Sequence, residues 1–416
     1  MNKKSLVDID VAGKRVLMRA DFNVPLEGGA VSDDTRISAA LPTIKHILDH
    51  GASLVLMSHM GRPKGKVNPE LTLAPAAARL SELLGKPVTF ANDCVGAEVE
   101  AQAQQLQAGE VLLLENLRFH AEEEGKATIA DDASADDIAA AKADMKARQR
   151  TFAEQLARLG DVYVDDAFGT AHRAHASMAG VTEFMQESVS GFLLEKEIQY
   201  LGKAIEAPER PFVAILGGAK ISGKIDVILN LIDKVDTVIV GGGLVYTMYK
   251  AMGLNIGDSL LEEDRVELAG EILKRFETSR AKLLMPLDHV IADGFSETAN
   301  TQIVDREAIP DGWEGLDIGP KSIALFVEEL RKAKTVLWNG PLGCFEMAPF
   351  AAGTMSIAKA IAETDCVSIV GGGDSISAIN KSGLTEHFSH LSTGGGASLE
   401  FLEGKALPGV VALSDR

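Results

Sequence analysis

Two lysines four residues apart follow a pair of glycines in the segment P-F-V-A-I-L-G-G-A-K-I-S-G-K at 211–224. The apolar run before the glycines is typical of a central strand in a parallel sheet. The spacing predicts that Lys220 and Lys224 share one face of the helical turn that follows. Unpaired backbone N–H groups at a helix start, the helix dipole and two ammonium groups together favour a polyphosphate. We therefore expect a nucleotide at this segment.

The same segment comes close to a P-loop, whose pattern is G-x-x-x-x-G-K-[ST]. Residues 218–225 match the pattern except at the last position, where Ile225 lacks the hydroxyl that would ligate magnesium. We therefore reject the P-loop. A tight strand-to-helix turn with solvated lysines would be the better explanation of an isolated G-G-x-K segment, so the rest of the chain must decide.

Glycine clusters follow the predicted strands of the second half of the chain, including the one at 212–216. Their residues include Gly217, Gly241, Gly242, Asn339, Gly372, Gly373, Asp374, Ser375 and Gly396. One cluster alone could be a turn or a helix cap, but five clusters at one predicted sheet edge allow backbone amides to surround a ligand. Asp374 adds a carboxylate that can hold magnesium. None of the clusters fits G-x-G-x-x-G, which argues against a dinucleotide.

Arginine and histidine follow the predicted strands of the first half instead. They occur in R-A-D-F-N (19–23), S-H-M-G-R (58–62), E-N-L-R-F (115–119) and D-A-F-G-T-A-H-R-A-H (166–175), and a further arginine lies in the helix-opening stretch S-D-D-T-R (32–36). Guanidinium groups bind carboxylate and phosphate oxygens with two parallel hydrogen bonds. Several arginines at one sheet edge therefore suit a small substrate that carries both groups.

Strand-like and helical segments alternate along the whole chain, which predicts parallel sheets covered by helices on both faces. The predicted strands are 15–20, 53–57, 88–91, 111–114 and 162–164 in the first half, and 212–216, 237–240, 282–287, 335–338 and 367–370 in the second. We expect two doubly wound, Rossmann-like α/β domains with an active site in the cleft between them. Ligands of such sheets lie beyond the carboxyl ends of the strands.

A helix is expected to connect the two domains, because residues 192–205 carry apolar side chains at helical spacing and prolines follow. The expected boundaries are 1–190 for the first domain, 191–207 for the connector helix and 208–402 for the second domain. A further segment, 121–150, is rich in Ala, Asp, Glu and Lys. Within it, Ser134 and Asp137 predict a capping box at the start of a long surface helix.

The composition narrows the class of protein. The chain has 416 residues, of which 46% are hydrophobic, and no apolar run approaches the length of a membrane helix. The net charge of −19 argues against nucleic acid or an anionic membrane as a partner. Asp8 and Asp10 interrupt what would have to be an apolar signal region, so we expect a cytoplasmic protein.

Neither cysteine nor histidine spacing indicates a metal site. Cys94, Cys344 and Cys366 show neither metal-ligand spacing nor a paired framework, and we expect reduced, mostly buried thiols. His172 and His175 have no third ligand at a convincing spacing, which argues against zinc.

Eight ordered motifs resemble those of the phosphoglycerate kinase family over nearly the whole chain. They are R-A-D-F-N-V-P-L, S-H-M-G-R-P, E-N-L-R-F-H, D-A-F-G-T-A-H-R-A-H-A-S, L-G-G-A-K, W-N-G-P-L-G, G-G-G-D-S and S-T-G-G-G-A-S-L-E. The resemblance implies a monomeric two-domain enzyme of glycolysis that transfers a phosphoryl group reversibly between 1,3-bisphosphoglycerate and ADP, with magnesium. It also implies that the tail, at about 403–416, packs back on the first domain.

The resemblance also implies a role for individual residues. Phosphoglycerate would bind to Asp21, Asn23, Arg36, His59, Arg62, Arg118 and Arg173. The nucleotide would bind to Gly217, Lys220, Lys224, Gly241, Gly242, Asn339, Glu346, Gly372, Gly373, Asp374 and Ser375, with Asp374 as the magnesium ligand. The groups implied to act in the transfer itself are Arg36, Lys220, Gly373 and Gly396.

The chain departs from the family pattern at a few positions. Asp165 stands where many members have Asn, Gly223 where many have Asp, and Ser375 where many have Thr. Ser375 keeps the hydroxyl, so a phosphate contact is retained. Asp165 adds a negative charge that would weaken the potential of the basic site if it were exposed. The segment 121–150 is longer than in compact bacterial members.

The expected mechanism needs no general base, because the carboxylate that attacks in the reverse direction is already deprotonated at pH 7. The protein must then align the two substrates for in-line transfer and neutralise the charge on the transferring group. We expect the domains to close about the connector helix when both substrates bind. The alternatives are a two-lobed solute-binding protein, which would normally carry an export signal, and an NAD-dependent dehydrogenase, which NAD rather than ATP would protect against unfolding.

Overall fold

The computed structural model describes residues 2–416, which divide into two compact units. Unit 1 comprises the chain up to Ile198 together with Ala406–Arg416, and unit 2 comprises Gln199–Lys405. The helix α6 (Phe192–Glu206) crosses the boundary between them. The predicted connector at 192–205 is therefore a continuous helix.

Unit 1 is built on six parallel strands in the order β5-β6-β4-β1-β7-β8. Their bounds are β1 (Arg15–Arg19), β4 (Ser53–Met57), β5 (Val88–Phe90), β6 (Val111–Leu113), β7 (Val162–Asp165) and β8 (Ser188–Ser190). A two-stranded hairpin of β2 (Leu26–Glu27) and β3 (Ala30–Val31) precedes the first helix. Each central strand is buried along nearly its whole length, as expected for a sheet covered on both faces.

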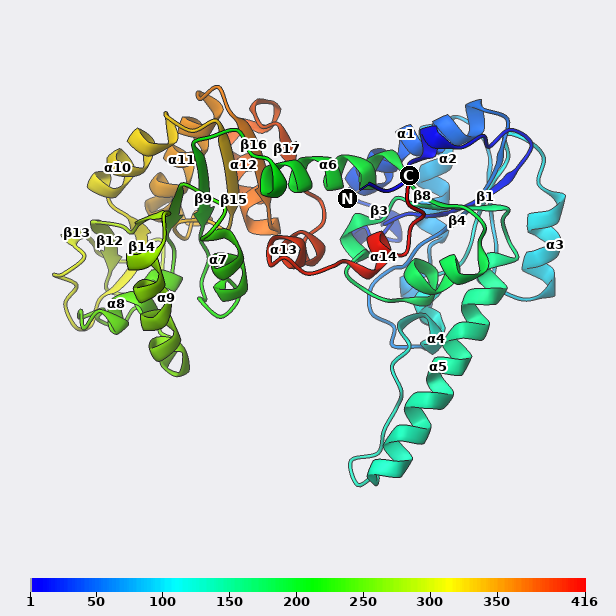
Figure 1. Cartoon of the computed structure of the whole chain (residues 1–416), viewed down its shortest axis with the longest axis horizontal. Helices are drawn as coiled ribbons and strands as arrows, with labels where there is room; N and C mark the ends of the chain where they lie inside the picture. The colour runs from blue at the N-terminus through cyan, green and yellow to red at the C-terminus, as the bar shows by residue number, and fades with distance from the viewer. Residues whose placement is uncertain (1) are drawn as a thin grey trace. The chain divides into compact units, whose positions relative to one another are not determined.

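Helices cover both faces of this sheet (Figure 1). They are α1 (Thr35–Asp49), α2 (Ala74–Leu84), α3 (Ala97–Gln105), α4 (Ala121–Glu124), α5 (Ala135–Ala157) and α14 (Pro408–Val411). The apolar sides of α1 and α2 form one core with Met18 and Leu54 from the sheet. Leu17 and Val55, which alternate with them along the strands, are equally buried and point to the opposite face.

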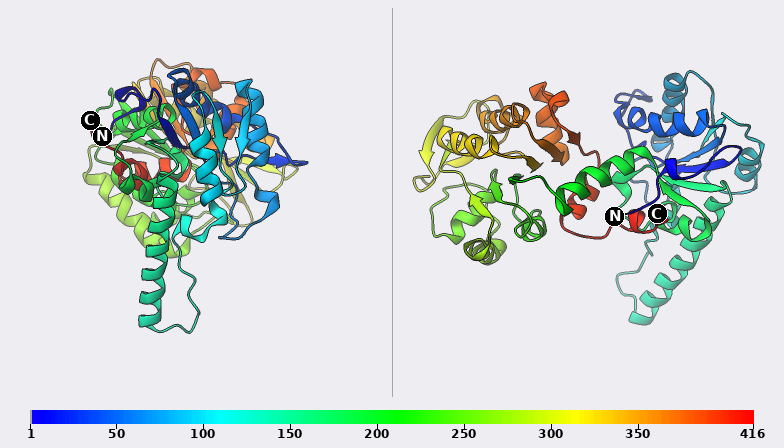
Figure 2. Two further views of the ribbon diagram at one scale, coloured as in Figure 1. Left: turned by 90° about the vertical axis from the view of Figure 1, so that its right-hand side faces the viewer. Right: turned by 45° about the horizontal axis from the view of Figure 1, so that its top comes forward.

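The helix α5 follows the predicted pattern. Ser134 accepts a hydrogen bond from the backbone N–H of Asp137, and the Asp137 carboxylate accepts one from the backbone N–H of Ser134, which completes the capping box. Met145 and Phe152 are buried on one side. Figures 1 and 2 show that the N-terminal part of the helix extends away from the rest of unit 1.

Unit 2 is built on a second sheet of six parallel strands, in the order β11-β10-β9-β15-β16-β17. Their bounds are β9 (Phe212–Leu216), β10 (Thr237–Val240), β11 (Lys282–Leu284), β15 (Thr335–Asn339), β16 (Val367–Gly371) and β17 (His390–Leu391). The helices are α7 (Ile225–Leu231), α8 (Leu244–Ala251), α9 (Val266–Thr278), α10 (Pro320–Leu330), α11 (Ala352–Ala362), α12 (Gly373–Ser382) and α13 (Gly396–Leu402). One core joins α10 and α11 to the sheet through side chains that include Phe326, Ile357 and Trp338.

All ten predicted strands are present, and the expectation of two doubly wound α/β domains is confirmed. The structure adds elements that the sequence analysis did not predict. These are the short edge strands β8 and β17, and an antiparallel sheet of β12 (Asp288–Ala292), β13 (Thr301–Asp305) and β14 (Glu314–Ile318). The predicted strand at 282–287 is wrong at its end, because β11 stops at Leu284 and the antiparallel β12 begins soon afterwards.

Both ends of the described chain lie in unit 1 (Figure 1). Lys3 pairs with Asp415 at 2.8 Å, and the Arg416 guanidinium donates to Asp8 at 2.8 Å. The backbone N–H of Gly409 donates to the carbonyl of Ala171 at 2.8 Å. Among the described residues, no helix is both long and apolar enough to span a membrane.

Two buried carboxylates occupy the end of β7. Asp166 accepts hydrogen bonds from the backbone N–H groups of Leu193 and Leu194 at 2.8 and 3.2 Å, so it caps the first turn of α6. Asp165 is fully buried and accepts one hydrogen bond, from the N–H of Ala167 at 3.0 Å. Burial raises the pKa of the Asp165 carboxyl to about 7, against the opposing effects of that hydrogen bond and of Arg19. Asp165 was expected to weaken the basic site only if it were exposed. Because it is buried, this condition is not met.

We predict that Asp165→Asn changes how stability depends on pH. The folded pKa of Asp165 is raised, so the folded state holds a proton that the unfolded state releases, and the native chain loses stability as pH rises from about 4 to 7. The variant lacks this loss. Its free energy of unfolding relative to the native chain should therefore rise by about 2 to 3 kcal/mol between pH 5 and pH 8.

Urea unfolding followed by circular dichroism at several pH values measures this difference. Asp131→Asn, at an exposed position, is the matched control and should show no such trend. A constant difference between Asp165→Asn and the native chain at all pH values would contradict the prediction.

Candidate active site

The carboxyl ends of β1, β4, β6 and β7 lie at the same edge of the unit 1 sheet, because these strands are parallel neighbours. This edge carries most of the basic residues that the sequence analysis singled out. They are His59 and Arg62 after β4, Arg118 after β6 and Arg173 after β7, with Arg36 in the first turn of α1. We call this set, with Asp21 and Asn23 after β1, the basic edge.

Two contacts fix the start of the basic edge. Asp21 accepts a hydrogen bond from Arg36 Nη1 at 3.0 Å, and both side chains are partly exposed. The side-chain carbonyl of Asn23 accepts from the backbone N–H of Gly61 at 2.9 Å. The loops after β1 and β4 are thereby held against each other.

Arg118 is held by the backbone around it. It lies in the 3-10 turn η3 (Leu117–Phe119), and its own backbone N–H donates to the side-chain carbonyl of Asn116, the N-cap, at 3.1 Å. Arg118 Nη1 donates to the carbonyl of Gly61 at 2.8 Å, and Nε lies 3.5 Å from the Glu124 carboxylate. Burial lowers the pKa of the Arg118 guanidinium from its ordinary value, which still leaves it charged at neutral pH.

Arg62 and Arg173 differ from Arg118 because they are exposed. Within residues 2–416, neither guanidinium has an ion-pair or hydrogen-bond partner. Unpaired guanidinium groups at the rim of a basic edge remain available to an anionic ligand.

Two further charged groups, Arg19 and Glu123, lie beneath the basic edge, and the sequence analysis did not name them as site residues. Arg19 and Glu123 are fully buried, and His59 is 4% exposed. Arg19 Nη2 lies 3.1 Å from His59 Nδ1. Burial first, and then the neighbouring cations, hold the pKa of His59 well below its usual range. The sequence around Glu123 shows no apolar periodicity, so only the contacts in the structure reveal that this side chain is buried.

His172 and His175, which resemble a metal pair in the sequence, serve a different purpose here. Nδ1 of the buried His175 lies 3.6 Å from Glu123 Oε1. Over residues 2–416, neither histidine belongs to a group of three close metal-ligand atoms.

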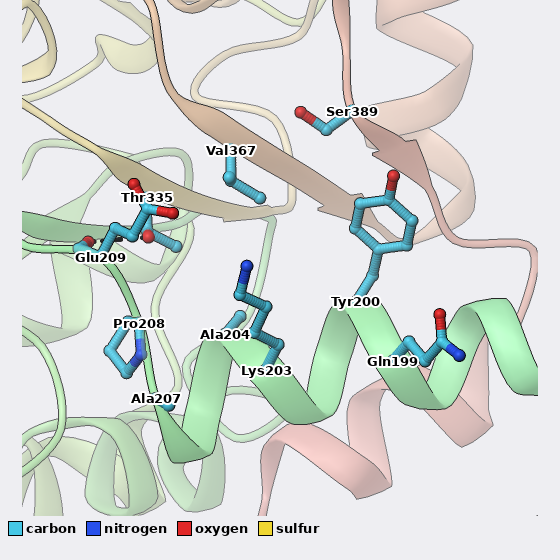
Figure 3. Close-up of a pocket in the computed structure, with 10 residues that line it drawn as sticks. All are labelled: Gln199, Tyr200, Lys203, Ala204, Ala207, Pro208, Glu209, Thr335, Val367 and Ser389. Carbon is cyan, nitrogen blue, oxygen red and sulfur yellow. Dashed lines mark hydrogen bonds between the residues drawn. The ribbon is translucent and has the colours of Figure 1, made fainter.

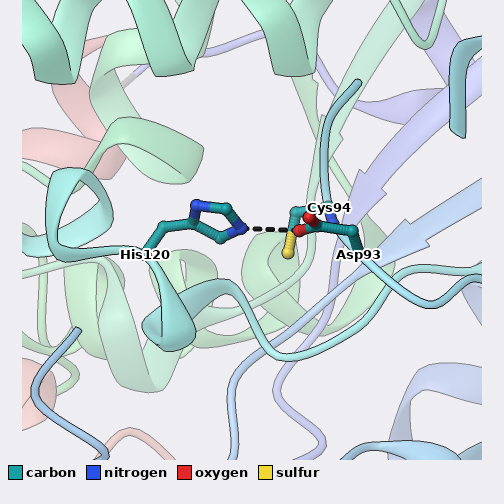
Figure 4. Close-up of side chains that lie close together, drawn as sticks. All are labelled: Asp93, Cys94 and His120. Atoms are coloured by element: carbon teal, nitrogen blue, oxygen red, sulfur yellow. Dashed lines mark hydrogen bonds and ion pairs between the residues drawn. The ribbon is translucent and has the colours of Figure 1, made fainter. Parts of the chain in front are cut away.

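Three other residues do bring candidate ligand atoms within 4.8 Å of one another, namely Asp93, Cys94 and His120 (Figure 4). His120 Nε2 lies 2.6 Å from the Asp93 carboxylate, and the thiol of Cys94 donates to the carbonyl of Glu115 at 2.9 Å. Cys94 is fully buried, and burial raises the pKa of its thiol well above the usual value. All three groups have partners within the fold, so we assign no metal to them.

The carboxyl edge of the unit 2 sheet carries the glycine clusters. Gly217 follows β9 and lies against the segment after β15, where a Cβ on Gly217 would lie 2.1 Å from the carbonyl oxygen of Pro341. Gly242 follows β10 with φ of 71°, and a Cβ there would lie 2.7 Å from the carbonyl oxygen of Gly218. The loops after β9, β10 and β15 therefore pack backbone to backbone, which only glycine permits at these points.

The prediction that Lys220 and Lys224 share one face of a helical turn is wrong. The helix α7 begins only at Ile225, so Lys220 lies in the preceding loop and Lys224 is the N-cap. The cause is Glu262, whose carboxylate accepts from the backbone N–H of Ser222 at 2.9 Å and from its hydroxyl at 2.5 Å. This contact holds 221–224 in a non-helical turn.

The two lysines have different surroundings. Lys220 is exposed, and its ammonium has no hydrogen-bond or ion-pair partner within the described part of the chain. Lys224 is partly buried and donates to the side-chain oxygen of Asn339. Burial lowers the pKa of Lys224 to about 8, although the carboxylates of Asp374 and Glu403 act in the opposite direction.

The cluster after β16 opens the ten-residue helix α12. Gly372 is its N-cap, and a Cβ on Gly373 would meet no atom within 4 Å. Asp374 is exposed and has no hydrogen-bond partner among residues 2–416. Ser375 is buried, and its hydroxyl accepts from the backbone N–H of Gly340 at 2.6 Å, which links this cluster to the loop after β15.

The remaining predicted residues of unit 2 are less constrained. Gly241 packs against the side chain of Leu342. Glu346 is exposed, and only its backbone carbonyl accepts a hydrogen bond, from Lys381 Nζ at 3.2 Å. Gly396 is the first residue of α13.

A pocket of about 340 Å³ in unit 2 lies elsewhere (Figure 3). It is lined by Tyr200 and Lys203 of α6 and by Thr335 and Val367, the first residues of β15 and β16. These are the amino ends of the strands. Ligands of parallel sheets bind beyond the opposite, carboxyl ends, so this pocket is not part of the candidate site.

Comparisons with known proteins give one consistent answer. The family model described as phosphoglycerate kinase matches residues 6–405. The phosphoglycerate kinases of Chloroherpeton thalassium and Moorella thermoacetica are 56% and 55% identical to this chain, and each alignment covers 100% of both proteins.

Solved structures agree. The phosphoglycerate kinase of Coxiella burnetii is 38% identical with a TM-score of 0.87, and that of Pyrococcus horikoshii OT3 is 32% identical with a TM-score of 0.79. Both comparisons cover 99% of this chain and 98% of the other. The chain therefore belongs to the phosphoglycerate kinase family.

Proposed function

We propose that this chain catalyses the reversible transfer of a phosphoryl group from 1,3-bisphosphoglycerate to ADP, which gives 3-phosphoglycerate and ATP. The observation that carries the proposal is the division of chemistry between two sheet edges. Forked guanidinium groups gather at the carboxyl edge of unit 1, while glycine amides and ammonium groups gather at that of unit 2. Membership of the family supports the same reaction.

The basic edge would hold the phosphoglycerate. Arg62 and Arg173 offer exposed guanidinium groups without internal partners, and Arg118 offers a partly buried one. Partial burial strengthens the attraction between Arg118 and an anion, because less water screens it. The full binding set that we propose is Asp21, Asn23, Arg36, His59, Arg62, Arg118 and Arg173.

Unit 2 would hold the nucleotide. The amides of Gly372 and Gly373 at the start of α12 suit the oxygens of a phosphate chain, and the Lys224 ammonium interacts electrostatically with Asp374 in the same helical turn. Gly217, Gly241 and Gly242 would line the adenine slot. The remaining proposed contacts are Lys220, Asn339, Glu346, Asp374, Ser375 and the amide of Gly396.

Magnesium fits the proposed nucleotide site, because the carboxylate of Asp374 is exposed and accepts no hydrogen bond from residues 2–416. Carboxylate and phosphate oxygens are the ligands that this ion prefers. Bound there with the nucleotide, magnesium would neutralise charge on the phosphate oxygens.

The chemistry asks little of the protein beyond position and charge. An acyl phosphate and ADP react without removal of a proton from carbon or from a neutral hydroxyl, so no general base is required. Arg36 and Lys220 would neutralise the charge that develops on the transferring group. Their donors belong to different units, so we propose that binding of both substrates brings the units together and excludes water. We further propose that the enzyme acts as a cytoplasmic monomer.

We predict that Lys220→Ala lowers turnover by on the order of 100-fold to 1000-fold without loss of fold. The side chain is exposed and has no hydrogen bond or ion pair within residues 2–416, so its removal should cost little stability. The assay measures the formation of ADP from ATP that depends on added 3-phosphoglycerate. Arg36→Ala should fall similarly, whereas Lys250→Ala, at an exposed lysine of α8, should remain near normal. Near-normal turnover of a folded Lys220→Ala protein would remove that assignment.

Asp374→Asn should raise the magnesium concentration needed for half-maximal activity by on the order of 10-fold or more. The amide keeps the shape of the side chain but loses the charge that holds the ion. Magnesium titrations at fixed ATP measure the effect. Asp365→Asn, at an exposed carboxylate beyond the opposite edge of the sheet, is the control. Identical magnesium curves for Asp374→Asn and the native chain would exclude Asp374 as a ligand.

A further inference from the structure

The contact between Arg19 and His59 fixes where the proton of the imidazole lies. Arg19 Nη2 lies 3.1 Å from His59 Nδ1, and both side chains are buried. A guanidinium group has only N–H donors and no acceptor. His59 Nδ1 must therefore accept, which requires that it carry no proton. A neutral imidazole with a bare Nδ1 carries its proton on Nε2.

Nε2 of His59 is free to use that proton. Within residues 2–416 it has no hydrogen-bond partner, and it is not among the buried polar atoms that lack one. It therefore retains contact with solvent at the basic edge, while Nδ1 is engaged from beneath. The ring presents one N–H donor outward.

Arg19 itself is held by a second layer of hydrogen bonds. Its Nε donates to Ser177 Oγ at 3.0 Å, and Nη1 donates to the carbonyl of Ala20. Ser177 Oγ in turn donates to Glu123 Oε1 at 2.6 Å. The backbone N–H of Ser177 donates to the other carboxylate oxygen, Oε2, at 3.0 Å. Each donor in this series faces one acceptor, so the direction of every hydrogen bond is determined.

We propose that Glu123, Ser177 and Arg19 form a buried relay that holds His59 as the neutral tautomer with its proton on Nε2. In this form His59 donates a hydrogen bond to the anionic substrate and cannot act as a base there. The three relay residues are positioning residues. That the acceptor is the phosphoglycerate rests on the proposed function, whereas the tautomer rests only on the contacts within unit 1.

The charges around His59 act in the same direction. Besides Arg19, the groups that face it are Arg118, Arg36 and His175, all of which oppose a positive charge on the ring. Two buried carboxylates lie near Arg19. Glu123 is directed at Ser177 and lies 3.6 Å from His175, and Asp165 accepts from the backbone N–H of Ala167. Desolvation adds to the effect of the cations. His59 should therefore keep the same protonation across the pH range in which a free histidine changes charge.

This arrangement suits a reaction in which two anions must meet. A neutral N–H donor orients an oxygen of the substrate without adding a charge whose strength varies with pH. The fixed cations of the basic edge, which are arginines, then supply the charge. The affinity for phosphoglycerate should accordingly not change with pH through protonation of His59.

Nitrogen NMR of the whole chain, labelled with 15N only at histidine, tests the tautomer directly and without substrate. The chain has 9 histidines, and the spectrum of His59→Gln identifies the signals of His59. We expect a protonated Nε2 and an unprotonated Nδ1 from pH 5.5 to pH 8. A cationic ring within this range, or a proton on Nδ1, would overturn the proposal.

Ser177→Ala tests the relay. It removes the hydroxyl between Arg19 and Glu123, so the His59 signals should become a mixture of tautomers or become pH-dependent. The KM for 3-phosphoglycerate should rise about tenfold, while the KM for ATP stays unchanged. Ser188→Ala removes a buried hydroxyl in unit 1 that has no hydrogen-bond partner within residues 2–416, and it should change neither the signals nor the KM values.

Unchanged His59 signals in folded Ser177→Ala would overturn the relay. The tautomer of His59 and the proposed function can be disproved separately. If the native chain formed no ADP in the presence of 3-phosphoglycerate, the proposed function would be lost, while the NMR result would still decide the tautomer.

Discussion

Both candidate sites depend on one constraint of parallel sheets, which is that all strands end at the same edge. In unit 1 this constraint places the loops after four strands beside one another, although they are separated by more than a hundred residues in sequence. In unit 2 it does the same for the glycine clusters. Side chains and amides that are scattered along the chain thereby become one surface. The helices on both faces leave these edges as the places where polar groups of the core can reach solvent.

Charge at the basic edge is arranged in layers. Exposed arginines form the outer layer, and the partly buried Arg118 lies behind them. Beneath lie the buried Arg19 and Glu123, whose opposite charges are linked through one serine hydroxyl. Burial of a charge without a partner is costly, so each inner charge needs the other. The chain as a whole has a net charge of −19, and an anionic substrate is therefore attracted only by this local arrangement.

Sequence alone predicted the fold and most of the residues at the two edges, because buried strands are apolar runs and the polar groups follow them directly. It failed where a distant residue decides a local structure. The helix after β9 starts late because Glu262, far along the chain, holds the turn before it. The strand β13 has mostly exposed residues and therefore no apolar signal. Arg19 opens one of the recognised motifs and Glu123 lies three residues after another, but nothing in their spacing reveals that they are buried together.

The return of Ala406–Arg416 to unit 1 has a consequence for how the protein is made. Unit 2 is inserted into unit 1, so the ribosome delivers the last piece of unit 1 after all of unit 2. Unit 2 can complete its core during synthesis, whereas unit 1 must wait for the final helix and its contacts with Ala171 and Lys3. Residues near the two described ends lie in the same unit and form ion pairs with each other. A circularly permuted chain that joins these ends would therefore allow unit 1 to emerge from the ribosome as one uninterrupted piece.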